Sequence, residues 1–240
     1  MKFKAIAVIA VAAALSAGMA GSAAASQLSH KAKPAPQVTG TRLQSALLPA
    51  SAFGSGFTVS GPLNTGKKLW STRALGTPQT LSCAKFEEYV YVGGFGNTAG
   101  ATAYINNPNP AFADYPSVVL GGDQTVIQFK TAAAATSFYN RAWAKYKQCS
   151  YFTESFAGDS QFELTNESLS TTTFKKNKAF QLIQYLDITS LPALNFYQNT
   201  TVVLSGTNVY TIEEGNGTND AVPTSLVGSL MTRVQAAYKK

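Results

Sequence analysis

Histidine, cysteine and acidic side chains are scarce in this chain of 240 residues, and their scarcity excludes most familiar catalytic sites. The one histidine, His30, lies in a polar, alanine-rich stretch, where it cannot anchor a Ser-His-Asp triad or a histidine-rich metal site. The 12 acidic residues leave paired-carboxylate glycoside hydrolysis as the enzymatic alternative, although solvated strand ends explain these residues more simply. We therefore expect no enzyme activity, no metal and no cofactor.

Long apolar runs are also missing, but the N-terminus has the features of an export signal. Two lysines precede an apolar run over residues 5–15, and small residues follow as far as Ala25. Because that run is short of the ~20 residues that span a bilayer, we expect residues 1–25 to be a cleaved signal peptide. Residues 26–40 are expected to form a disordered tether, and residues 41–240 a single folded domain of a secreted or cell-wall-associated protein.

The chain has only two cysteines, Cys83 and Cys149. In an exported protein such a pair is expected to form a disulfide, so no thiol nucleophile remains. The two residues are far apart and lack companion ligands, which argues against a metal or redox role.

The formal charge of +7 comes from lysines and arginines scattered along the chain. Nucleic-acid-binding proteins instead concentrate charge on one face, between stacking aromatic side chains, so we expect no nucleic-acid partner. Weak attraction to an anionic cell envelope, which would fade with added salt, is the milder interpretation.

A long amphipathic helix is the clearest element. It follows a strand over 124–129, Thr131 is a plausible N-cap, and the helix ends at Cys149. Pro223 is expected to open a second long helix near the C-terminus. A shorter helix is expected from Thr41, which forms a capping-box pattern with Gln44. The apolar stripe of the first long helix consists of Ala135, Phe138, Tyr139, Ala142, Trp143, Tyr146 and Cys149.

The remaining patterned segments alternate with the period of strands. Because short turns join several of them, the expected fold is α+β, a single domain with one disulfide in which the helices gather on one face of an antiparallel sheet. The expected strands lie around 57–60, 87–92, 99–105, 118–120, 162–164, 169–173, 179–188, 200–204 and 209–212.

The order of these landmarks resembles a known family. The strand over 125–129, the alanine-rich helix that contains Trp143 and ends at Cys149, the hairpin over 204–209 and the C-terminal helix resemble the extracellular sensor domain of mycobacterial PknH-type receptor kinases. The resemblance covers 41–238 and extends to free-standing secreted relatives in actinobacteria. It implies an antiparallel sheet flanked by two long helices, a ligand-binding cleft and a disulfide between Cys83 and Cys149. The chain lacks the second cysteine pair of that family, a kinase and a membrane helix.

A site is expected on the sheet face away from the helices. If 87–92 is a strand, Tyr89 and Tyr91 point to that face, joined by Tyr104 and Tyr185, with Gln184 or Gln181 as a hydrogen-bond donor according to register. The alternative is that these tyrosines only cover the sheet under a loop.

Our sequence hypothesis is a secreted, non-catalytic, sensor-like domain that binds an unidentified extracellular ligand or envelope component. The alternative is a protein- or cell-wall-interaction module with a partner protein and no small ligand.

Overall fold

A computed structural model of the chain describes residues 36–64, 81–89, 95–107, 121–155, 161–188 and 195–239. The predicted signal peptide, most of the tether and the strand expected at 118–120 lie outside these ranges. Val38 is buried, and the first helix starts at Gly40, one residue before Thr41.

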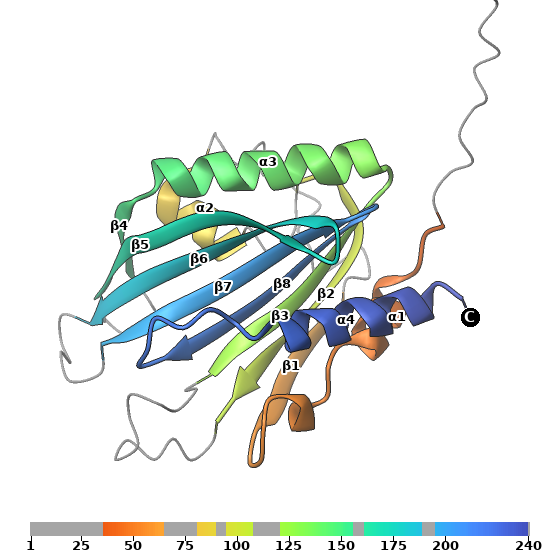
Figure 1. The fold of residues 1–240 in the computed structure, drawn as a ribbon, viewed down its shortest axis with the longest axis horizontal. Coiled ribbons are helices and arrows are strands. Elements are labelled where there is room, and N and C mark those ends of the chain that lie inside the picture. Colours follow the sequence, from red (N-terminus) through yellow and green to blue (C-terminus); the bar gives the residue numbers. More distant parts are fainter. Residues whose placement is uncertain are drawn as a thin grey trace, which may run out of the picture. The chain divides into compact units, whose positions relative to one another are not determined.

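Within the described residues, eight strands form one sheet in the order β1-β2-β3-β8-β7-β6-β5-β4, and every neighbouring pair is antiparallel (Figure 1). The strands are β1 (Thr58–Asn64), β2 (Asn97–Asn106), β3 (Gly121–Phe129), β4 (Tyr151–Ser155), β5 (Gln161–Phe174), β6 (Asn177–Ile188), β7 (Phe196–Ser205) and β8 (Asn208–Asn216). The helices are α1 (Gly40–Ala46), the 3-10 turn η1 (Ala50–Ala52), α2 (Cys83–Tyr89), α3 (Ala132–Gln148) and α4 (Thr224–Ala237).

The expected sheet flanked by two long helices is wrong. The described chain is mostly an eight-stranded antiparallel sheet accompanied by a few short helices of 7 to 17 residues. The helices are also not gathered on one face. The reason is that the central strands carry apolar side chains on both faces, and each face needs its own cover.

Each face of the sheet has its own core. On the first face, Val126, Val203 and Tyr210 pack with residues of α1 and α4. On the second face, Ile127 and Phe180 pack with α2 and α3. Alternation along each strand separates the two sets, so the central strands are buried from both sides. We refer to these as the α4 face and the α3 face.

The helix α3 forms as the sequence predicts. The hydroxyl of Thr131 accepts a hydrogen bond from the backbone N–H of Ala134 at 3.1 Å, which confirms it as the N-cap. The ring of Phe180 lies below the helix and meets those of Tyr139 and Trp143 at centroid distances of 5.2 and 5.5 Å. Aromatic packing of this kind fixes α3 on the sheet.

Two local predictions are wrong. The N-cap of α1 is Thr39, whose hydroxyl accepts from the N–H of Arg42, and not Thr41. The run 87–92, expected as a strand, begins inside α2, because a six-residue alternation is too short to separate the two periods. Packing decides in favour of the helix, since Phe86 is fully buried with its ring 4.9 Å from that of Tyr146.

The expected disulfide is present. Cys83 and Cys149 are joined across a sequence separation of 66 residues, with their Cα atoms 5.5 Å apart. Because Cys83 is the first residue of α2 and Cys149 follows the end of α3, the bond holds the two helices of the α3 face together.

Two buried glutamines of β3 hold the N-terminal segment against the α4 face. The amide of Gln124 accepts from the N–H of Leu48 at 2.6 Å and donates to its carbonyl at 2.8 Å. Gln128 makes the same pair of bonds to Val38, at 2.9 and 3.0 Å. These bonds satisfy backbone groups that would otherwise be buried without partners.

Candidate functional site

Polar side chains form a continuous band on the α3 face, beside the apolar area that α3 covers. Sheet register brings them together: Tyr104, Asp123, Glu213 and Thr200 are consecutive partners across β2, β3, β8 and β7. We call this set the polar band; it consists of Thr102, Tyr104, Asp123, Thr125, Gln184, Gln198, Thr200, Thr211 and Glu213.

Most of the polar band is closed to solvent. Gln184 and Thr125 are 0 % exposed, and Thr211 and Thr200 are 1 % exposed. Tyr104 is 49 % exposed and marks the end of the band that meets solvent. Burying so many polar groups on a sheet face is costly unless each finds a partner, so their hydrogen bonds decide what the band can do.

Some of these groups are paired and others are not. Thr125 and Thr102 join their hydroxyls at 2.7 Å, and Thr200 donates to Glu213 at 3.3 Å. In contrast, Oγ1 of Thr211 and both polar atoms of the Gln184 side chain are buried without a hydrogen-bond partner among the residues that the structure describes.

Within the described ranges Oδ1 of Asp123 is likewise buried and unpaired, although the residue as a whole is only half-buried. Burial raises the pKa of Asp123 from its ordinary 3.8 to about 7, against an opposing hydrogen bond with Thr125. Asp123 faces Glu213 directly across β3 and β8. Near neutral pH its carboxyl therefore holds a proton in part of the molecules and offers a donor as well as an acceptor.

Gln184 lies in a row of three amides. Its register partners are Gln198 on β7 and Asn166 on β5. Asn166 donates to the carbonyl of Tyr146 at 2.9 Å, next to a bulge in β5, which directs its amide to the end of α3. The amide of Gln184 therefore has two donors and one acceptor oxygen that no described residue satisfies.

The residues expected to form a site are only partly brought together. Tyr104 and Gln184 both lie on the polar band. Tyr185 lies on the opposite face, where its ring is 5.3 Å from that of Tyr197 and its hydroxyl accepts from Asn195. Tyr89 belongs to α2, so the alternation that placed it on a strand face does not hold, and Tyr91 lies outside the described residues.

Sequence reasoning missed Asp123 and Thr211 as members of the site. Alternation along β3 does put Asp123 and Thr125 on one side, and alternation along β8 does the same for Thr211 and Glu213. The missing information was the pairing of β3 with β8, which lie far apart in the chain.

The described ranges contain no group of three or more His, Cys, Asp or Glu side chains suited to a metal ion. Among the same residues, no helix is long and apolar enough to cross a membrane. The polar band therefore offers hydrogen-bonding groups and two carboxyl groups, without a metal centre in the part of the chain described.

Comparisons with known proteins support the fold and go no further. No protein-family model and no curated protein matches the chain. Among solved structures, it is similar to the extracellular domain of PknH from Mycobacterium tuberculosis, with a TM-score of 0.56 and 17 % sequence identity. The match covers 86 % of this chain and 99 % of that one. The chain thus has a fold like that of the PknH extracellular domain.

Proposed function

We propose that this protein is an exported, non-catalytic, sensor-like domain that binds a small polar ligand at the polar band. The observation that carries the proposal is the set of buried polar atoms without partners on Asp123, Gln184 and Thr211, all on one face of the sheet. Each such atom costs about 1–3 kcal/mol unless something satisfies it. A bound ligand with both donors and acceptors, such as a sugar or an amide-bearing fragment, meets that need.

Export and a sensor-like role have separate support. Disulfides persist in oxidising compartments, and the chain carries one between α2 and α3. The fold is like that of the extracellular domain of PknH, and this analogy of fold supports a sensor-like role without identifying the ligand.

The test is a thermal-shift screen of the oxidised mature protein against sugars, polyols, short peptides and lipids, followed by calorimetric titration of any ligand that raises the melting temperature. Thr211→Val removes an unpaired hydroxyl from the polar band without changing side-chain shape. Thr201→Val is the matched control, because Thr201 is equally buried and equally unpaired but lies on the α4 face.

We expect Thr211→Val to weaken ligand binding by a few-fold to about tenfold, the value of one hydrogen bond, and Thr201→Val to leave it unchanged. Equal effects of both variants would contradict binding at the band. If the folded protein shows no shift with any ligand class, the unpaired atoms are satisfied by ordered water alone. The alternative of an interaction module with a protein partner would then replace this proposal.

A further inference from the structure

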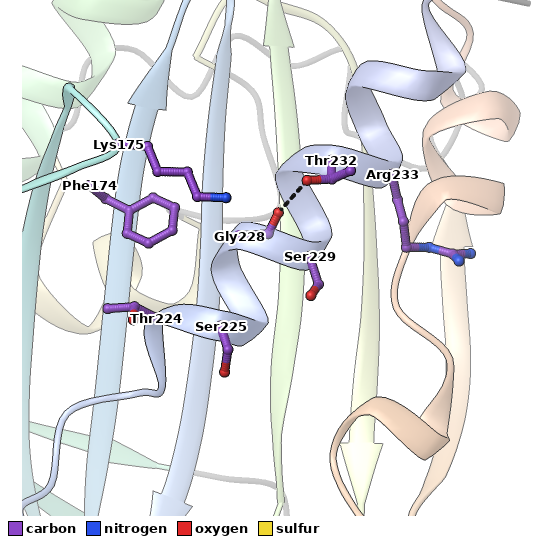
Figure 2. A pocket seen from close by; sticks show the side chains of 8 residues that line it. All are labelled: Phe174, Lys175, Thr224, Ser225, Gly228, Ser229, Thr232 and Arg233. Carbon is purple, nitrogen blue, oxygen red and sulfur yellow. Dashed lines mark hydrogen bonds between the residues drawn. The ribbon is translucent and has the colours of Figure 1, made fainter.

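An open pocket of about 500 Å³ lies beside α4 (Figure 2). Phe174, which lines it, packs with the core of the α4 face, so the pocket lies on the opposite side of the sheet from the polar band. Its walls are the β5–β6 turn, through Phe174 and Lys175, and one side of α4 that includes Gly228 and Arg233. A second pocket of about 230 Å³ shares Arg233 and reaches Arg42 of α1. We call the two together the α4 groove.

The α4 groove is cationic and rich in hydroxyl groups. Lys175, Arg233 and Arg42 line it, and none of the described lining residues is acidic. Between the cations lie hydroxyl side chains, of which those of Ser225 and Ser229 are exposed. Thr232 instead donates to the carbonyl of Gly228 at 2.8 Å, the bond drawn in Figure 2.

The turn that carries Lys175 is built in an unusual way. Lys175 and Lys176 have φ angles of 46° and 68° and connect two paired strands. A two-residue hairpin turn with both residues left-handed favours Asn-Gly, since lysine rarely adopts this conformation. The chain nevertheless places lysine at both positions, which puts two positive charges at the tip of the hairpin beside α4.

The hairpin tip can approach α4 because residue 228 is glycine. A Cβ there would lie 3.1 Å from Cζ of Phe174 and 3.4 Å from Nζ of Lys175. The same ammonium group stands 5.6 Å from the centroid of the Phe174 ring. Lys175 is thus directed along the groove, as Figure 2 shows, with an aromatic ring beside its charge.

At the other end, Arg233 is held rigidly without a carboxylate. Its Nε donates to the carbonyls of Ala46 and Leu47 at 3.1 and 3.0 Å, and its Nη2 donates to that of Ser45 at 3.3 Å. These bonds fix the guanidinium at the end of α1 and leave its positive charge uncompensated among the described residues.

We propose that the α4 groove binds an anionic polyol chain, a carbohydrate or polyol polymer that carries phosphate groups. Separated cations suit phosphates spaced along a chain, and the hydroxyl side chains between them suit the polyol units. The half-buried ring of Phe174 adds an apolar surface for a sugar face. This site is independent of the polar band, because it lies on the other face of the sheet.

The test is binding of a poly(glycerol phosphate) chain to the oxidised mature protein, measured at low and high salt. The variant is Arg42→Gln with Lys175→Gln, which spares the structural bonds of Arg233. The matched control is Lys130→Gln with Lys147→Gln, which changes the net charge equally; both lysines are exposed, one just before α3 and one in its last turn. Ser229→Glu, which places a negative charge inside the groove, is a second variant.

We expect the groove double variant to bind about tenfold more weakly than the unmodified protein, and Ser229→Glu to weaken binding as well. The control and Thr211→Val should bind normally, and affinity should fall with added salt. Equal weakening by both double variants would overturn the proposal, because net charge alone would then explain binding.

Other probes distinguish the proposed chain from other molecules that could occupy the α4 groove. Neutral dextran should not bind. Equally tight binding of polyglutamate would overturn the proposal in favour of an acidic peptide, and binding only to phosphatidylglycerol vesicles would favour a membrane surface. Absence of binding by a protein that melts cooperatively would overturn it outright. None of these outcomes affects the polar-band proposal, since Thr211→Val reports on that site alone.

Discussion

Asp123→Asn should make the protein less sensitive to pH, and more stable at alkaline pH. Asparagine keeps the shape of the side chain and cannot ionise. The folded protein raises the pKa of Asp123 to about 7, so the native state retains a proton that the unfolded chain releases near 3.8. The native state therefore loses stability as pH rises from about 4 to about 7, and above that range the penalty is constant.

The size of the stability difference follows from the pKa shift of Asp123. At about 1.4 kcal/mol for each pH unit between 3.8 and about 7, burial of this carboxyl costs up to about 4 kcal/mol above neutral pH. Asp123→Asn should recover part of that amount at about pH 8.5 and close to none at about pH 4. Burial also raises the pKa of Glu214, but that contribution is common to both proteins and cancels in their difference.

The assay is urea unfolding of the oxidised protein and of Asp123→Asn across this pH range, compared as a difference in the free energy of unfolding at each pH. Asp220→Asn, which removes a negative charge at an exposed position, is the control. A difference that does not grow with pH would refute the assignment of a buried, protonated carboxyl to the polar band. So would a variant that is less stable than the unmodified protein at about pH 8.5.

Three further changes test what holds the fold together, each by denaturant unfolding at neutral pH. Replacing Cys83 and Cys149 by serine should cost about 4 kcal/mol, the loop-closure value for 66 residues, and a loss under 1 kcal/mol would contradict a constraining role. Gln124→Ala should cost about 2–4 kcal/mol, since it strands both backbone groups of Leu48; an unchanged midpoint would show that water replaces the amide. Phe180→Ala should cost about 3–5 kcal/mol of unfolding free energy and loosen α3, because its ring packs against Tyr139 and Trp143. Hydrogen exchange of the α3 amides would detect the loosening, and exchange as slow as in the unmodified protein would contradict this role of Phe180.

The success of α3 and the failure at 87–92 have one explanation. Seventeen residues of helical period, begun by the Thr131 cap, leave no competing interpretation. The six residues 87–92 fit either period, and burial of Phe86 against α3 favours helix where that run begins. Local pattern is decisive where it is long, and tertiary contact decides where it is short.

The predicted placement of the helices on one face was wrong for a different reason. The alternation of β3 shows that Val126 and Ile127 point to opposite faces, but both are apolar. Such a strand needs cover on each side, so α4 and α3 lie on opposite faces, whereas the sequence analysis placed them on one. Composition of the central strands, more than helix length, determines the layers.

The candidate site could be predicted only in fragments. Gln184 and Tyr104 were identified as polar or aromatic groups on a sheet face, without knowledge of which face each strand presents. The partners that complete the polar band, Asp123 and Thr211, become neighbours only when β3 pairs with β8. Register between distant strands is set by the whole fold and is not visible in either segment alone.

The most direct test of the polar band follows the side-chain amide of Gln184 by nuclear magnetic resonance while a ligand from the thermal-shift screen is added. The signal is assigned by its absence in Gln184→Leu, and Gln181, on the other side of the same strand, provides an internal reference. The account predicts that the Gln184 amide shifts to saturation with the affinity measured by calorimetry, while the Gln181 amide does not move. A ligand that saturates the protein and leaves the Gln184 signal unchanged would contradict it.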